Sequence, residues 1–506
     1  MNTDHSPSAQ EWTRRFWLVL AGVFVFRLAY LALVPIDLVP DEAYYWDWSR
    51  RLDWCYYSKP PMVAWLMALS TRLFGVSEFA VRLQAAVLNT AALAAVFLLG
   101  RAMFGSAAGF MAAVSFLVTP GNFFAGTLST IDPPLIAFWS LSLYLLWRAV
   151  AAEDGGLWWW LAAGVCGALG VLSKQMMLAM PALVLVHLAF CPRHRAALRR
   201  PGVYLFIIIT LLGLVPIIHW NIGHNWVTLR HTGEHFNPGR VSFFRFISTF
   251  FYFVGTQMCV ISPLMWLVFV AVIVMTARHV RTADERVRFL LVLTALPLAV
   301  VALMSLRQRI HPNWPAVFYI AGSVLAGAWA CGGVSCGTVV DYARRYYRYA
   351  LGLGVLMSVV AAAGFPLAAS SALGEKVLAK GLGGWRSLGR QVGERFAALP
   401  DRDRVFIAGV RREVTAELAF YLPGRPQVYE WPMDIYVQSQ YGVWGGPTNK
   451  LGWNGLVVMD AKRQPSAEMR TYFSFLEDAG EVVTEPGGRR FHLYLGRGLN
   501  RWHTLK

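Results

Sequence analysis

The chain has 506 residues, of which 56% are hydrophobic and 21 are tryptophan, far more apolar surface than one soluble core can bury. We therefore expect a polytopic α-helical membrane protein. The net charge of +17 does not indicate a nucleic-acid partner, because lysine and arginine gather at the ends of apolar runs, as in the positive-inside pattern of membrane proteins.

About eleven apolar segments come close to the ~20 residues that a helix needs to cross a bilayer. The first has no small-residue cleavage pattern after it, so we expect a retained membrane helix rather than a cleaved signal. The segments are 16–36, 79–100, 106–120, 133–150, 157–173, 176–191, 203–220, 259–277, 289–305, 315–333 and 349–367.

Four basic clusters predict the orientation of these segments. They are Arg14 with Arg15 and the ranges 193–200, 278–288 and 344–348, and all fall on one face if each segment crosses once. We expect that face to be cytoplasmic, so Asp41 and the C-terminus lie outside. A further aromatic segment is 243–254. If it crossed the membrane, one basic cluster would lie on the wrong side, so we expect it along the outer interface.

Beyond residue 370 the composition becomes mixed, and short apolar runs alternate with helical patterns, as in a small soluble α/β domain. We divide the chain into a membrane domain, 1–369, and a soluble domain, 370–506. The first outer loop of the membrane domain is 37–78. Six cysteines are scattered through the membrane domain without a CxxC pair, so no disulfide framework is indicated.

Two adjacent acids, Asp41 and Glu42, follow the first predicted helix, where two prolines should end it. The aromatic residues after them favour a helix at the membrane interface. Acids at a helix start also complement the helix dipole, so a structural role competes with a catalytic one. Asp132, before two prolines, poses the same choice, because it is equally suited to cap the helix that follows.

Several positive residues fall on the outer side, against the orientation rule and close to the membrane boundary. Charge at this depth needs an anionic partner, and a lipid-linked phosphate supplies one at headgroup level. Each residue alone has a structural alternative, which is to extend its charge to lipid headgroups. The candidate phosphate-binding residues are Lys59, Arg82, Lys174, Arg240, Arg307 and His311.

Histidines also occur in the outer segments, and Glu234 with His235 could contribute to a metal site. Their spacing matches no closed zinc pattern. We therefore predict no metal and no other cofactor, and keep a divalent metal at these two residues as the less favoured alternative.

The motifs around these residues resemble those of glycosyltransferase families 39 and 83, which include protein O-mannosyltransferases and lipid A aminoarabinose transferases. The similarity runs from about residue 16 to 370 and is densest in the first 135 residues. The resemblance implies a GT-C fold that accepts a polyprenyl-phosphate sugar from the bilayer and uses the first outer loop for catalysis. The motifs are Asp41 with Glu42, Lys59 to Pro61, residues 74–83 and Asp132 with Pro133.

The resemblance also implies roles for single residues. Asp41 matches the family's essential acid, Asp132 a second important acid, and Lys59 the lysine that meets the donor phosphate. We group Asp41, Glu42 and Asp132 as predicted catalytic acids, because a carboxylate near a sugar hydroxyl helps to remove its proton. Residues 307–314 occupy the position of a donor-contacting segment. Ser58 stands where aminoarabinose transferases carry an acid that helps to hold a metal, which argues against a bound metal.

These features predict an inverting glycosyltransferase of the bacterial inner membrane, with its site and C-terminal domain on the periplasmic face. The expected partners are membrane lipids, a polyprenyl-phosphate sugar donor and an acceptor that is a glycolipid, such as lipid A, or an envelope polysaccharide. A protein O-glycosyltransferase is one alternative. A lipid-linked sugar flippase or another transporter is the second, although transporters usually hold their charged sites near mid-membrane. The C-terminal domain either recognises the acceptor or covers the site.

Overall fold

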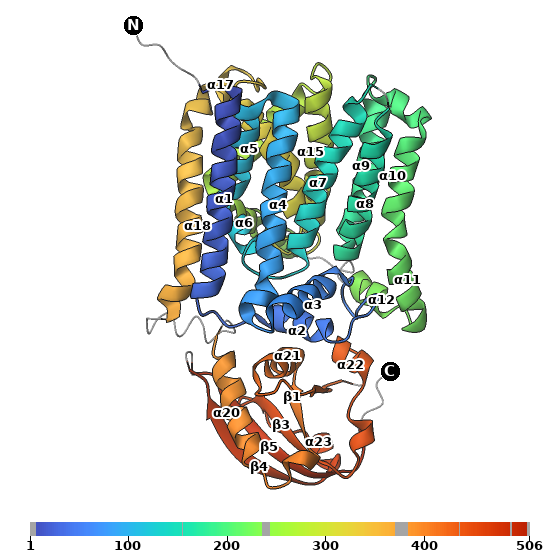
Figure 1. Cartoon of the computed structure of the whole chain (residues 1–506), viewed down its shortest axis with the longest axis vertical. Helices are drawn as coiled ribbons and strands as arrows, with labels where there is room; N and C mark the ends of the chain where they lie inside the picture. Colours follow the sequence, from blue (N-terminus) through green and yellow to red (C-terminus); the bar gives the residue numbers. More distant parts are fainter. Residues whose placement is uncertain are drawn as a thin grey trace.

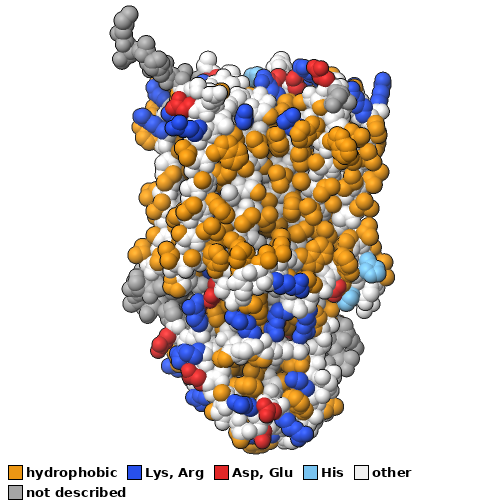
Figure 2. Space-filling view, in the orientation of Figure 1, with side chains coloured by type: hydrophobic (Ala, Val, Ile, Leu, Met, Phe, Trp, Pro, Cys, Tyr) orange, Lys and Arg blue, Asp and Glu red, His pale blue; other side chains and the backbone are white. Residues whose placement is uncertain are grey.

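The computed structural model describes residues 7–153, 155–234, 243–369, 383–434, 436–485 and 488–502. Figure 1 shows an upright bundle of helices with a sheet-containing domain beneath one end. In Figure 2, hydrophobic side chains cover the visible side of the bundle as a band, and charged side chains gather at its two ends. That distribution is typical of a helix bundle that spans a bilayer.

Seven helical stretches among the described residues are long and apolar enough to cross a membrane. They fall in α1 (Ala9–Leu33), α4 (Glu78–Phe104), α7 (Asp132–Ala151), α10 with α11 (Pro201–Leu212, Leu214–Gly223), α13 (Phe243–Ile261), α15 (Glu285–Ser305) and α17, η4 and α18 (Thr338–Tyr342, Ala343–Tyr346, Tyr347–Ala369).

Shorter apolar helices complete the bundle. They are α3 (Met62–Phe74), α5 (Ser106–Leu117), α8 (Leu157–Ser173), η1 with α9 (Gln175–Leu178, Ala179–Phe190), α14 (Pro263–Arg278) and η3 with α16 (Ala316–Phe318, Tyr319–Ala330). Helices thus occupy all eleven predicted segments, and the predicted polytopic helical fold is confirmed. The aromatic segment predicted along the outer interface forms α13, and its place relative to the membrane remains a prediction.

Glycine allows close contact between helices α4 and α5. Gly100 of α4 faces Gly109 of α5, and a Cβ added at Gly109 would lie 2.6 Å from the carbonyl oxygen of Phe97. Because the neighbouring atoms belong to the backbone, they cannot rotate away from a larger residue. These two glycines therefore set the distance between α4 and α5.

The C-terminal domain contains a five-stranded sheet with strand order β2-β1-β3-β5-β4. Strands β1 (Val405–Val410), β2 (Val428–Trp431) and β3 (Asn454–Asp460) are parallel, whereas β4 (Phe473–Val483) and β5 (Arg490–Leu499) pair antiparallel. Helix α21 (Arg412–Tyr421) packs between the sheet and the bundle, and α20 (Trp385–Ala397) runs along the sheet beside α21 (Figure 1). The predicted soluble α/β domain is confirmed. Its boundary at residues 369 and 370 falls where the described residues stop, and remains a prediction.

Short helices occupy the connections. They are α6 (Pro120–Ala125), η2 (Arg195–Arg199), α12 (Val227–Glu234), η5 (Arg402–Arg404), α22 (Gln440–Trp444), η6 (Thr448–Lys450) and α23 (Ala467–Thr471).

The predicted first outer loop contains α2 (Pro40–Ser49), which lies with α3 between the bundle and the C-terminal domain (Figure 1). Its aromatic side chains Tyr44, Trp46 and Trp48 are buried in one hydrophobic core with residues of α20, α21 and the sheet. These rings pack inside the protein rather than on its surface. One core therefore joins the two domains. The place of α2 at the membrane interface remains a prediction.

Candidate active site

A polar cavity of about 500 Å³ lies where the bundle meets the C-terminal domain. It brings together five of the predicted site residues, which are Asp41, Lys59, Asp132, Lys174 and His311. The other residues that line it are Tyr44, Tyr45, Tyr57, Ser58, Thr130, Ile131, His231, Asn313, Trp314, Arg412 and Gln438. The cavity thus collects two carboxylates and several cations from segments far apart in the sequence.

Asp41 is held at the cavity wall by the first turn of α2. Pro40 starts this helix, because its fixed φ suits the first helical position. The Asp41 carboxylate is half exposed and lies 3.0 Å from the guanidinium of Arg412, at the start of α21. Burial lowers the pKa of Arg412, but the nearby Asp41 carboxylate outweighs this and raises the pKa above its ordinary value.

Arg412 was not among the predicted site residues, because its partner Asp41 lies near the other end of the chain. The available signal is local: Arg412 follows a buried strand, β1, and begins a helix. Residues at that position often contribute to ligand sites in α/β sheets.

Asp132 and Lys174 form a second ion pair in the cavity, with 2.9 Å between the carboxylate and the ammonium group. Asn313 donates a hydrogen bond of 2.6 Å to the other oxygen of Asp132. The side chain of Asp132 makes no capping hydrogen bond to α7, whose N-cap is Ile131. The capping alternative is therefore wrong, and Asp132 instead positions Lys174.

Lys59 differs from these residues because its ammonium group forms no ion pair with any described residue. Burial and the neighbouring Lys174 lower the pKa of Lys59, and Asp41 and Asp132 offset part of this effect. Two lysines that share a partly buried cavity repel one another unless an anion lies between them. The cavity is therefore electrostatically suited to a bound anion.

Glu42 and Arg82 do not line this cavity. Glu42 is fully buried, lies 2.6 Å from Arg82, and accepts a hydrogen bond of 2.8 Å from the backbone N–H of Ser129. Arg82 also donates to the carbonyl oxygens of Ile36 and Asp37. The two were predicted to act in the site, but the structure makes them a buried clamp that joins α2, α4 and the segment before α7.

The remaining predicted residues lie elsewhere. Arg307 is exposed after α15 and does not line the cavity. Arg240, His235 and the side chain of Glu234 lie outside the described residues, so the metal alternative there is untested. Among described residues, one group could hold a metal, namely buried His187, Cys191 and His194. It lies at the end of α9 that is remote from Lys174.

An apolar cavity of about 290 Å³ adjoins the polar one, because Thr130, Asp132 and Asn313 line both. Its other walls are mainly hydrocarbon and aromatic side chains from α5, α6, α7, α13 and α14, such as Phe116, Phe124 and Phe269. A ligand with an anionic head and a hydrocarbon tail matches this pair of cavities.

Comparisons with known proteins are consistent with this geometry. A family model described as dolichyl-phosphate-mannose-protein mannosyltransferase matches residues 58–220. The lipid A galacturonosyltransferase of Rhizobium johnstonii is 26% identical over 313 residues, which cover 61% of this chain and 64% of the relative. An undecaprenyl phosphate-alpha-4-amino-4-deoxy-L-arabinose arabinosyl transferase of Pseudomonas savastanoi is 29% identical over 35% of this chain and 36% of its own. The chain thus spans less than two thirds of either curated relative.

Solved structures match over nearly the whole chain. ArnT from Cupriavidus metallidurans, solved with undecaprenyl phosphate, has a TM-score of 0.66 at 18% identity, and the match covers 96% of this chain and 98% of ArnT. The oligosaccharyltransferase AglB from Archaeoglobus fulgidus has a TM-score of 0.53 at 12% identity, over 89% of this chain and 70% of AglB. The chain therefore has the GT-C fold, and the resemblance to GT-C glycosyltransferases that its sequence indicates is confirmed.

Proposed function

We propose that this protein is an inverting glycosyltransferase of the bacterial inner membrane. It moves a sugar from a polyprenyl-phosphate donor to a glycolipid acceptor such as lipid A at the periplasmic face. The observation that carries this proposal is the polar cavity around Lys59 and its apolar neighbour, which share Asp132 and Asn313. A polyprenyl phosphate has the same two parts, an anionic head and an apolar tail.

The residues of the polar cavity support a single displacement step. Asp41 takes the proton of an acceptor hydroxyl while the hydroxyl oxygen bonds to the anomeric carbon of the sugar. The bond from that carbon to the phosphate oxygen breaks, and its electron pair stays on the polyprenyl phosphate. Attack from the side opposite the leaving phosphate inverts the anomeric centre.

Two lysines stabilise the charge that develops on the leaving phosphate. Lys59 is available for this role because no described carboxylate pairs with it. Lys174 is held in place by Asp132. We assign Asp132 a positioning role on this basis.

The choice of acceptor is supported by the names of similar proteins. The relative from Rhizobium is named for transfer to lipid A, and the relative from Pseudomonas for an undecaprenyl-phosphate sugar. Those names describe the relatives, and the present chain takes the same class of substrates in this proposal.

The proposal is tested with purified full-length protein in proteoliposomes that contain undecaprenyl-phosphate sugars and lipid A, with product detection by mass spectrometry. Asp41→Asn should lower the transfer rate by about 10²- to 10⁴-fold, the range of general base catalysis. Lys59→Ala should weaken donor use by about tenfold or more, the effect of losing a charge-assisted contact. Asp401→Asn and Lys462→Ala, both exposed on the C-terminal domain, are the matched controls.

Wild-type turnover by Asp41→Asn would contradict the catalytic role. Movement of the lipid-linked sugar across the bilayer without any glycosylated product would favour a flippase. Comparison of envelope glycolipids from a deletion strain and its parent identifies the transferred sugar through the missing mass.

A further inference from the structure

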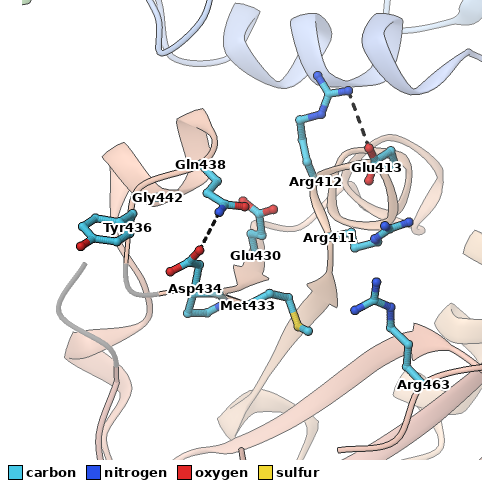
Figure 3. A pocket seen from close by; sticks show the side chains of 11 residues that line it. Arg411, Arg412, Glu413, Glu430, Met433, Asp434, Tyr436, Gln438, Gly442 and Arg463 are labelled. Atoms are coloured by element: carbon cyan, nitrogen blue, oxygen red, sulfur yellow. Dashed lines mark hydrogen bonds and ion pairs between the residues drawn. The ribbon is translucent and has the colours of Figure 1, made fainter. Parts of the chain in front are cut away.

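A second polar pocket, of about 370 Å³, lies within the C-terminal domain (Figure 3). We call it the strand-end pocket, because its walls follow the carboxyl ends of three parallel strands. Arg411 follows β1, Met433 follows β2, and Arg463 follows β3. Ligands of α/β sheets bind outside the carboxyl ends of parallel strands, where successive connections leave in opposite directions. Strand β1 lies between β2 and β3 and so provides such a point.

The charges in this pocket favour an anion. Figure 3 shows the side chain of Arg463 extending toward the guanidinium group of Arg411. Within the described residues, neither guanidinium forms an ion pair or a side-chain hydrogen bond. Each guanidinium presents a planar fork of donors that matches a phosphate or carboxylate oxygen pair.

The carboxylates that line the pocket are engaged with other groups. Glu413 lies 3.8 Å from Arg412, Glu430 accepts a short hydrogen bond from Ser439, and Asp434 accepts one of 3.0 Å from Gln438. Burial also raises the pKa of Glu430 to about 7, so this carboxyl carries only part of a negative charge near neutral pH. The three carboxylates thus offset part of the positive charge of the pocket, and Arg411 and Arg463 are the two arginines of its lining that form no ion pair with a described residue.

The strand-end pocket adjoins the polar cavity that contains Asp41. Arg412 and Gln438 line both spaces. In Figure 3, Arg412 extends toward the pale blue helices of the N-terminal part, away from Arg411 and Arg463. The side chain of Arg412, which pairs with Asp41, thus connects the walls of the two spaces.

We propose that the strand-end pocket binds an oxyanion carried by the acceptor, between Arg411 and Arg463, and so directs the acceptor hydroxyl to Asp41. This inference rests on the proposed function and deepens it, because it assigns the acceptor a negatively charged group and the C-terminal domain the task of recognising it. The donor phosphate has separate cations, Lys59 and Lys174.

Arg411 offers a variant that removes the charge without a cost in folding. Its φ is +102°, a conformation that residues with a side chain rarely adopt and that glycine adopts freely. Arg411→Gly is therefore expected to unfold at the same temperature as the wild type or a higher one. Combined with Arg463→Gln, it removes both guanidinium groups.

The experiment measures equilibrium binding of lipid A to full-length protein in detergent, with no sugar donor present. Two probes are compared, lipid A that carries its phosphates and the same lipid A after their removal. The double variant Arg411→Gly with Arg463→Gln should bind phosphorylated lipid A about a hundredfold more weakly, roughly tenfold for each charge-assisted contact. Its affinity for dephosphorylated lipid A should not change. The control Arg390→Gln with Arg490→Gln removes two exposed charges from the same domain and should behave as the wild type.

Three results would overturn the proposal. They are an unchanged affinity of the double variant for phosphorylated lipid A, an equal loss for both forms of lipid A, and wild-type protein that binds both forms equally. A separate arm uses inorganic phosphate and follows the midpoint of thermal unfolding. If phosphate stabilises wild type but not the double variant while lipid A binding is unaffected, the pocket takes free phosphate and the acceptor role is wrong. Because no donor is present, these outcomes are distinct from a failure of sugar transfer.

Discussion

Lys59 is surrounded by groups that act on its charge in opposite directions. Burial and Lys174 lower its pKa from the ordinary value of 10.5, and the carboxylates of Asp41 and Asp132 raise it. The ammonium form is the one that can bind a phosphate, and it is lost as the pH rises through this lowered pKa. The catalytic pH range should therefore end below the ordinary titration range of lysine.

We predict an alkaline decline in kcat/KM for the proposed donor, because that ratio reports ionisations of the free enzyme. Lys59→Arg keeps the charge to much higher pH and should move the decline upward. The measurement is the pH profile of kcat/KM for wild type, Lys59→Arg and the control Lys462→Arg. An identical decline in wild type and Lys59→Arg would exclude Lys59 as its origin.

Individual site residues could be predicted where the local sequence carries the signal. Asp41 and Lys59 stand out because charges beside prolines in an outer loop have few structural uses. Arg412 could not be found in this way, since its role depends on a contact between the two ends of the chain. Asn313 falls in the donor-contacting segment that the sequence singles out, but no rule pointed to its amide.

At the scale of elements, α2 owes its position to the clamp between Glu42 and Arg82. The pair is almost completely buried, and Glu42 also accepts a hydrogen bond from the N-cap backbone N–H of α2. Loss of one partner leaves an uncompensated buried charge, which typically costs about 3–5 kcal/mol. The clamp therefore matters for folding even though it does not line the cavity.

We predict that Glu42→Gln lowers the midpoint of thermal unfolding strongly, in line with a loss of about 3–5 kcal/mol. The matched control is Glu11→Gln, which breaks the exposed pair of Glu11 with Arg15 and should cost less than about 1 kcal/mol. Unfolding is followed in detergent by circular dichroism. Equal midpoints for the two variants would show that the clamp contributes little.

Helix existence was predictable, because a run of apolar residues is a local property that the bilayer requires. The surroundings of each helix could not be predicted in the same way. The aromatic side chains of α2 have the composition of an interfacial helix, yet Trp46 and Trp48 are buried against the C-terminal domain. The same aromatic residues suit a membrane interface and a buried contact with another domain. The sequence of α2 alone does not indicate that the C-terminal domain packs against it.

For the whole molecule, a buried hydrophobic core joins the two domains beside the polar cavity. Tyr44 of α2 is fully buried there, and its hydroxyl accepts a hydrogen bond of 2.5 Å from the backbone N–H of Gln440. Arg386 adds ion pairs to Asp37 and Glu78 across the same interface. The domains therefore form one unit, and changes at their interface should affect the stability of the whole chain.

Tyr44→Phe should destabilise the protein by about 1–3 kcal/mol, because it leaves the buried N–H of Gln440 without its acceptor. Tyr494→Phe removes only a weak hydrogen bond of 3.4 Å within the C-terminal domain, and should change stability by less than about 0.5 kcal/mol. Thermal unfolding of the two variants in the same detergent compares them directly. A larger loss for Tyr494→Phe would contradict a shared core.

Arg412 and Gln438 belong to the late part of the chain, yet they complete the wall of a cavity whose first residue is Asp41. During synthesis, the membrane helices are translated before strand β1. Throughout that interval the nascent chain lacks the C-terminal residues that bury Trp46 and Trp48 of α2. The wall of the polar cavity is therefore complete only after Gln438 has been made, when most of the chain is already translated.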